Sequence, residues 1–122
     1  MSPIPPMERT IDIAAMVAYA AATWDHHRMH YDHAWARDRD LPGPVVDGQA
    51  LGALLAEQVL DHFGPRAFVR VLDVRYRSMV FAGETVRCEG EIVAADGDEV
   101  VVMQEAKVGD RVAATAETTV KL

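Results

Sequence analysis

An acid and an imidazole stand five positions apart in the first third of this 122-residue chain, at Asp25 and His30. A carboxylate and an imidazole can hold one water molecule between them, one accepting its proton while the other donates one, and imidazole does this near neutral pH. We therefore take the two as a candidate catalytic pair. The alternative is that both are loop residues that cap nearby backbone. Trp24, Met29 and Trp35 are expected to keep bulk water away from the pair.

A glycine, Gly48, stands where the longest helical pattern of the chain begins. A glycine in the first turn of a helix offers an unhindered N–H at the positive end of the helix dipole. That combination can stabilise an oxyanion, such as the oxygen of a thioester carbonyl as it becomes enolate-like. The alternative is that Gly48 only permits a tight turn. Val46, Asp47 and Trp24 are further candidates for substrate contact.

Four histidines fall within eight residues, at His26, His27, His30 and His33, which raises the possibility of a metal site. A helix would place His26 and His30 on one face. However, the chain has no cysteine cluster and no distant ligand set of the usual kind. We therefore expect no metal.

The charge of the chain argues against a nucleic-acid partner, because 19 acidic residues outnumber 12 basic ones and give a net charge of -7. Phosphate binding requires clustered Lys and Arg. Four arginines in strand-like segments could meet the phosphates of a coenzyme A or phosphopantetheine arm, although such residues on strands are more often solvated on an outer face: Arg70, Arg75, Arg77 and Arg87.

The hydrophobic pattern predicts the elements that position these residues. Thr10 is predicted to cap a helix whose apolar positions run from residue 11 to residue 21. Asp32 is predicted to cap a short helix through residue 37, and residues 47–63 are predicted to form the longest helix. Four segments rich in Val, Thr and aromatic residues are predicted strands, at 68–80, 84–94, 99–108 and 111–120. The order indicates an α+β protein whose antiparallel sheet is covered by the long helix and completed by a second subunit. We expect one domain over 1–122, with residues 1–7 as a loose arm.

The single cysteine, Cys88, lies in a strand-like run and is expected to be a small buried hydrophobe and not a nucleophile. It cannot form an internal disulfide, which favours a reducing compartment. No apolar run approaches the roughly 20 residues of a membrane span, and the first residues lack the pattern of a signal peptide. We expect a cytoplasmic protein without a membrane partner.

Two segments carry a family resemblance: residues 19–32, YAAATWDHHRMHYD, and residues 44–51, PVVDGQAL. They resemble the MaoC-like hydratase/dehydratase family, in which Gly-Asp-x-Asn-Pro-x-His is followed later by His-Gly. The spacing from Asp25 to His30 is kept, whereas His27-Arg28 replaces Asn-Pro and Asp47 replaces the histidine before the glycine. The resemblance covers roughly residues 8–120. It implies a dimer-forming hot-dog fold, a catalytic pair of Asp25 and His30, and a Gly48 amide that polarises the thioester carbonyl.

The resemblance further implies a lyase that hydrates a trans-2-enoyl thioester or dehydrates a 3-hydroxyacyl thioester, as R-specific enoyl-CoA hydratases do. Coenzyme A or acyl carrier protein would be the handle of the substrate, and no cofactor would be needed. A homodimer or higher oligomer, or a heteromer with another hot-dog subunit, is expected. Three alternatives remain open: a non-catalytic subunit that binds an acyl group, a hot-dog thioesterase using Glu57, or a polyketide-tailoring dehydratase or cyclase.

Overall fold

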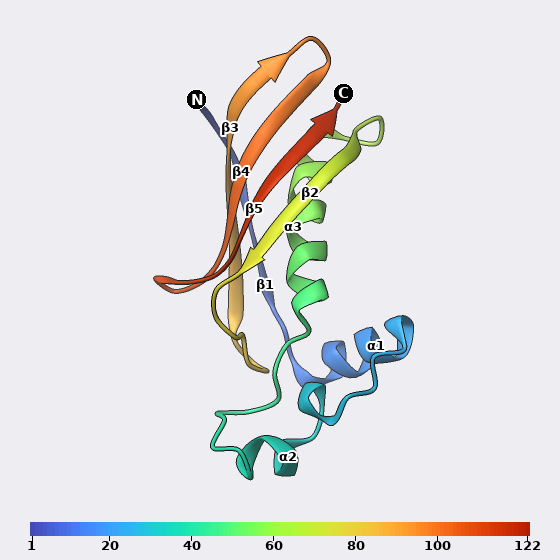
Figure 1. The fold of residues 1–122 in the computed structure, drawn as a ribbon, viewed down its shortest axis with the longest axis vertical. Helices are drawn as coiled ribbons and strands as arrows, with labels where there is room; N and C mark the ends of the chain where they lie inside the picture. The colour runs from blue at the N-terminus through green and yellow to red at the C-terminus, as the bar shows by residue number, and fades with distance from the viewer.

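The strand-like segments of the C-terminal half form an antiparallel sheet that curves around the long helix (Figure 1). The structure is a computed structural model that describes residues 1–122. Along the chain the elements are β1 (Ser2–Thr10), α1 (Ile13–Thr23), the 3-10 helix η1 (Arg28–His30), α2 (His33–Arg37), α3 (Gly48–Phe63), β2 (Phe68–Tyr76), β3 (Thr85–Asp96), β4 (Glu99–Val108) and β5 (Arg111–Lys121). The five strands lie in the order β1-β3-β4-β5-β2, and every neighbouring pair is antiparallel. The predicted α+β hot-dog architecture is confirmed.

Helix α3 lies along one face of the sheet, while α1, η1 and α2 gather beyond the end of the sheet where α3 begins (Figure 1). The Asp47 side chain caps α3 by accepting a hydrogen bond from the Gln49 N–H at 3.0 Å, and the helix ends at Gly64, whose φ of 91° is accessible to glycine. Leu51, Leu55 and Val59 are buried between α3 and the sheet. The burial of these side chains holds α3 against the sheet.

The first residues form an edge strand, so the prediction of a loose arm over residues 1–7 is wrong. Strand β1 pairs with β3 over its whole length, with an irregularity between Ile4 and Met7. Pro5 and Pro6 occupy that irregularity, since a proline has no N–H for the ladder and is tolerated on an edge strand. Ile4 is buried in the core, and this burial holds the strand in place.

The first helix begins after Asp12 and not after Thr10 as predicted. The Asp12 side chain accepts a hydrogen bond from the Ala15 N–H at 2.8 Å, which is the N-cap interaction. Thr10 instead belongs to β1, where its hydroxyl lies 2.7 Å from that of Thr85 on β3. The predicted cap of the short helix is confirmed, because the Asp32 side chain accepts a hydrogen bond from the Trp35 N–H.

A buried polar network ties α3 to the sheet. The Gln104 amide on β4 donates to the Leu55 carbonyl and to Gln58 Oε1, both at 2.8 Å, and it accepts from the Thr118 hydroxyl at 2.6 Å. The Gln58 amide in turn donates to the carbonyls of Pro5 and Cys88. The network therefore joins α3 with strands β1, β3, β4 and β5.

Cys88 is buried in the core, as predicted, and its burial raises the pKa of the thiol to about 11. At neutral pH it is a protonated thiol without nucleophilic character. Separately, none of the helices has both the length and the apolar character needed to cross a membrane.

Candidate active site

The loop between α1 and α2 delivers both members of the predicted pair. Asp25 follows Trp24, whose left-handed backbone (φ 57°) ends α1. His30 is the last residue of η1. The His27 Nδ1 atom caps η1 by accepting a hydrogen bond from the Met29 N–H at 3.0 Å. The side chain of this histidine thus takes part in holding the loop that orients His30.

The His30 ring has a defined proton arrangement. Its Nδ1 atom lies 2.7 Å from the Val45 carbonyl oxygen, which can only accept, so Nδ1 donates and carries a proton. In the neutral ring, Nε2 therefore carries the lone pair. Nε2 lies 3.2 Å from Asp25 Oδ2 and 3.7 Å from Asp47 Oδ2. With the residue only 8% exposed, this nitrogen is placed to act as a general base.

Asp47 is a third member of the cluster. Sequence reasoning proposed it only for substrate contact, yet one ligand atom from each of Asp25, His30 and Asp47 lies within 4.8 Å of the others. The signal in the sequence that could have identified Asp47 is its position directly before Gly48, where it caps α3. Burial and the nearby Asp25 carboxyl raise the pKa of Asp47, whereas the neighbouring Asp47 carboxyl, followed by the charge of His30, lowers the pKa of Asp25.

Asp25, His30 and Asp47 are also the residues that could together bind a metal ion. A divalent cation uses nitrogen and carboxylate donors of this kind. The other clustered histidines, His26, His27 and His33, are not part of this group. That the protein works without a metal stays a prediction.

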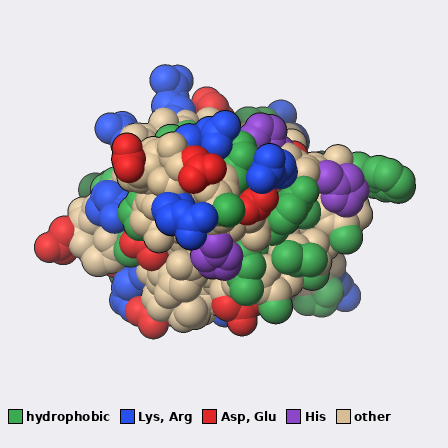
Figure 2. All heavy atoms as spheres, turned by 90° about the horizontal axis from the view of Figure 1, so that it is seen from below, with side chains coloured by type: hydrophobic (Ala, Val, Ile, Leu, Met, Phe, Trp, Pro, Cys, Tyr) green, Lys and Arg blue, Asp and Glu red, His purple; other side chains and the backbone are tan.

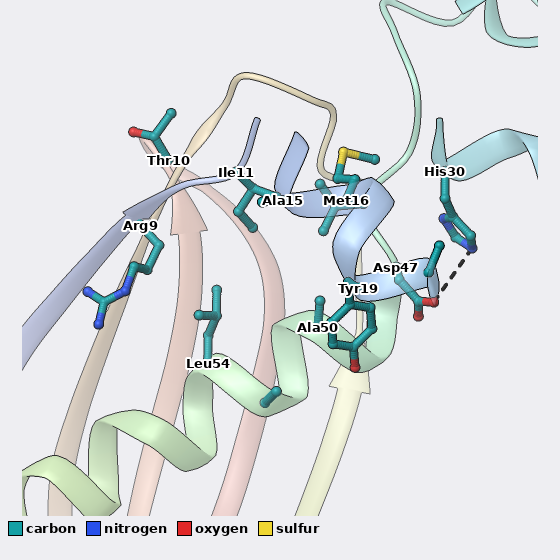
Figure 3. Close-up of a pocket in the computed structure, with 13 residues that line it drawn as sticks. Arg9, Thr10, Ile11, Ala15, Met16, Tyr19, His30, Asp47, Ala50 and Leu54 are labelled. Atoms are coloured by element: carbon teal, nitrogen blue, oxygen red, sulfur yellow. Dashed lines mark ion pairs between the residues drawn. The ribbon is translucent and has the colours of Figure 1, made fainter. Parts of the chain in front are cut away.

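An apolar cavity of about 260 Å³ ends at His30 and Asp47 (Figure 3). Arg9 and Thr10 lie at its other end, and Tyr19 projects beside Asp47 and Ala50. Most of the remaining wall is aliphatic, and it includes Ile11, Met16, Ala20, Val46, Ala53 and Leu54. Such a chamber suits a hydrocarbon chain whose reactive end meets the His30 imidazole, whereas Asp25 does not line the cavity.

A second, more open groove touches His30 from another side and contains Gly48. The Gly48 N–H makes no hydrogen bond inside the subunit. A Cβ at this position would lie 3.3 Å from the Tyr76 ring, so the close approach of helix and strand favours glycine. His30 thus stands between an apolar chamber and a groove that offers a free helix-terminal N–H.

A family model described as a MaoC-like domain matches residues 1–117. The chain belongs to the MaoC-like domain family. It is 24% identical over 120 residues to the (R)-specific enoyl-CoA hydratase of Aeromonas caviae, covering 95% of this chain and 90% of that protein. The solved structure of the (R)-hydratase from A. caviae superposes with a TM-score of 0.91 over 97% of this chain and 92% of that one, at 24% identity.

Two other solved structures that are similar to this chain are protein complexes. The ChsH1-ChsH2 complex from Mycobacterium tuberculosis gives a TM-score of 0.92 at 22% identity, covering 99% of this chain and 95% of that one. The HadBC (3R-hydroxyacyl-ACP dehydratase) complex from the same organism gives 0.77 at 20% identity, covering 95% and 91%. At these identities the likeness establishes the fold of the domain.

The aromatic residues of the MaoC-like domain lie differently from the prediction. Trp24 is 84% exposed and packs edge-on against His26, outside both recesses, so the prediction that it excludes water is wrong within the subunit. The Arg39 guanidinium lies 3.8 Å from the centre of the Trp35 ring, and the edge of that ring contacts His27, which packs in turn against His30. Only Met29 lines a recess, the groove with Gly48. Figure 2, seen from the end where α1 and α2 lie, shows histidine, apolar and charged side chains interspersed on the surface.

The charged candidates of the MaoC-like domain separate into paired and unpaired groups. Arg70 pairs with Glu99 at 2.6 Å, and Arg87 pairs with Glu8 and Glu89. Arg75 and Arg77 make no ion pair, and Arg77 lines the groove that contains Gly48. Glu57, the candidate for thioester hydrolysis, is held by Arg9 at 2.6 Å on α3 and lines neither recess.

Proposed function

We propose that this protein is a hydratase or dehydratase that adds water to a trans-2-enoyl thioester or removes it from a 3-hydroxyacyl thioester. The observation that carries the proposal is the Asp25–His30 pair, 3.2 Å apart, in which His30 lines both the apolar cavity and the groove that contains Gly48. Membership of the MaoC-like family supports it. The A. caviae relative, an (R)-specific enoyl-CoA hydratase by name, supports the same chemistry and the R configuration.

In the hydration direction, the Asp25 carboxylate and His30 Nε2 hold one water molecule. Nε2 accepts a proton from that water while the water oxygen bonds to C3 of the enoyl group. The electrons of the C2–C3 double bond move toward the thioester oxygen, where the Gly48 N–H stabilises the developing negative charge. Nε2 then returns the proton to C2, so the product carries OH at C3 and H at C2. Dehydration is the reverse sequence.

The two recesses suit the two ends of the proposed substrate. The acyl chain occupies the apolar cavity, whose 260 Å³ compares with roughly 30 Å³ for one water molecule in the liquid. The coenzyme A or phosphopantetheine arm leaves through the groove beside Gly48, toward the unpaired Arg77. Arg77→Ala is expected to raise KM for an acyl-CoA with little change in kcat, because a phosphate contact remote from the reacting atoms binds ground and transition states alike. Arg70→Ala, which removes an arginine paired with Glu99, is the matched control.

A second subunit is expected to complete the site. Strand β2 is an edge of the sheet, and it exposes large apolar side chains at Phe68, Val71 and Tyr76. Exposed edges and apolar rows of this kind are usually covered by a partner. The homologous complexes named above are heteromeric, so a homodimer and a pairing with another hot-dog subunit are both compatible with this surface. Light scattering of wild type and Val71→Lys tests whether this edge holds the oligomer together.

The decisive experiment follows hydration of crotonyl-CoA and longer enoyl-CoAs by loss of the enoyl absorbance. Asp25→Asn and His30→Ala are each expected to lose about a hundredfold or more, the scale of a missing general acid–base group. Asp12→Asn, which changes an exposed helix cap of the same residue type, is the control and should keep wild-type activity. Full activity in either site variant refutes the assigned roles. A wild type that is inert on every thioester, alone and with candidate partner subunits, refutes the enzyme.

A further inference from the structure

The Asp47 carboxyl group is unusual among the acids of this protein because it is buried and half unsatisfied. The residue is 9% exposed. Its Oδ1 accepts the capping hydrogen bond from the Gln49 N–H. Its Oδ2 is the only buried side-chain nitrogen or oxygen atom of the structure without a hydrogen-bond partner. A buried carboxylate oxygen left without a donor is costly, so this atom calls for an explanation.

The neighbours of Oδ2 supply no proton to a carboxylate. His30 Nε2 is 3.7 Å away, beyond hydrogen-bond distance, and in the neutral ring it carries the lone pair, because Nδ1 donates to Val45. The other neighbour is the carboxylate of Asp25, whose Oδ2 contacts the same Nε2. Two ionised carboxylates in one partly buried site repel each other, and such pairs retain one proton between them. Oδ2 therefore fits a hydroxyl donor better than a charged acceptor.

We propose that Asp47 keeps a proton on Oδ2 and donates it in a hydrogen bond to the Asp25 carboxylate, as a positioning residue for the catalytic pair. Asp25 then stays ionised and is fixed relative to His30, while the site carries one negative charge and not two. The effect on catalysis rests on the function proposed above, whereas the shared proton does not.

Every titratable group that faces Asp47 is compatible with this state. Asp25 and His30 come from the loop after α1, Tyr19 from α1 and Tyr76 from β2. Burial, with a further contribution from the Asp47 charge, raises the pKa of both tyrosines, so they stay neutral. Burial raises the pKa of Asp47 as well, and the neighbouring Asp47 carboxyl lowers the pKa of Asp25, in the directions that a shared proton requires.

A protonated Asp47 predicts how activity depends on pH. Loss of the Asp47 proton removes the hydrogen bond and places a second negative charge beside Asp25. Asp25 loses its fixed position, and activity falls on the alkaline side of the titration. In Asp47→Asn the side-chain amide can donate to Asp25 at any pH, and asparagine still caps a helix, so the fold is retained. That variant should lose this alkaline fall.

The test is a pH titration of the Asp side-chain carboxyl carbons by NMR, in wild type, Asp47→Asn, and Asp12→Asn as the control cap. In wild type, Asp25 and Asp47 should each show two steps, one below and one above the ordinary Asp value of about 3.9, because the two groups titrate as a pair. In Asp47→Asn the upper step should vanish from Asp25. A single step near the ordinary value for both carboxyls, or an upper step that survives Asp47→Asn, overturns the proposal.

Kinetics then test positioning separately. The kcat of Asp47→Ala, which loses the donor, should lie about tenfold to a hundredfold below that of Asp47→Asn, the range expected for a displaced catalytic group. Equal kcat values and equal pH profiles in the two variants overturn the positioning role. If the NMR steps are seen but no enoyl thioester is hydrated, the shared proton stands and the proposed function fails, so the two failures are distinguishable.

Discussion

Replacing Gln104 by leucine tests how α3, the helix that starts at the site, is anchored to the sheet. Gln104 makes three buried hydrogen bonds, to Leu55, Gln58 and Thr118. Leucine has a similar volume but can make none of them. The Leu55 carbonyl is a backbone acceptor within α3, so two side-chain groups are left stranded in the core: the Thr118 hydroxyl and Gln58 Oε1.

The expected cost follows from these two groups. A buried polar group deprived of its partner costs about 1–3 kcal/mol, so Gln104→Leu should lower the free energy of unfolding by about 2–6 kcal/mol. Thr118→Val alone strands only Gln104 Oε1 and should cost about 1–3 kcal/mol. In the double variant the hydroxyl is gone as well, and only Gln58 Oε1 is left unpaired. Adding Thr118→Val to Gln104→Leu should therefore restore about 1–3 kcal/mol.

Urea unfolding followed by circular dichroism, at one fixed protein concentration because the protein is expected to be oligomeric, measures all four states of this cycle. The decisive result is that Thr118→Val raises the free energy of unfolding of the Gln104→Leu variant but lowers that of the wild type. If the costs of the two single substitutions simply add, Gln104 and Thr118 do not depend on each other and the assignment of the network is refuted.

Three further predictions concern other parts of the molecule. Cys88, with a thiol pKa of about 11, should react with a thiol reagent at pH 8 only at the rate of unfolding, and reaction without urea would show that the thiol is accessible. Gly90→Ala should destabilise the fold by about 1–3 kcal/mol in urea unfolding, because its Cβ would lie 3.0 Å from the buried Ile4 side chain; an unchanged midpoint would mean that β1 yields freely. Because the pKa of Asp47 is raised in the folded protein, its contribution to stability is complete below the pKa of an unfolded Asp and is lost as pH rises through the folded pKa. Between these two pKa values, the free energy of unfolding of Asp47→Asn should therefore rise relative to that of the wild type, as measured by urea unfolding at several pH values.

The longest elements were predictable because local chemistry and burial agree there. Residues 47–63 combine an Asp cap, a wide apolar stripe and a Gly-Pro stop, and the observed helix spans Gly48–Phe63. The proximity of the candidate pair was predictable for a different reason: Asp25 and His30 are close in sequence, so a single loop brings them together.

The features that were missed depend on contacts between distant segments. Nothing local marks residues 2–10 as a strand, since three prolines lower the strand propensity and only pairing with β3 and burial of Ile4 compensate. Asp47 has the ordinary signature of a helix cap, and its approach to His30 arises only when η1 and the start of α3 meet. Trp24 was misplaced because a large apolar ring next to a catalytic acid indicates burial, whereas its backbone turns the ring outward at the end of α1.

The meeting of η1 and α3 depends on one residue, Val45. Its N–H donates to the Met29 carbonyl at 2.6 Å and its carbonyl accepts from His30 Nδ1 at 2.7 Å, so it fixes both the position and the tautomer of the imidazole. Val45 also bridges to Phe81, and the next N–H, that of Val46, donates to the Val80 carbonyl at 2.7 Å. The same short segment leads directly into Asp47 and Gly48. The proposed base His30, the second carboxyl Asp47 and the proposed oxyanion donor Gly48 are therefore all held by a single stretch of hydrogen-bonded backbone.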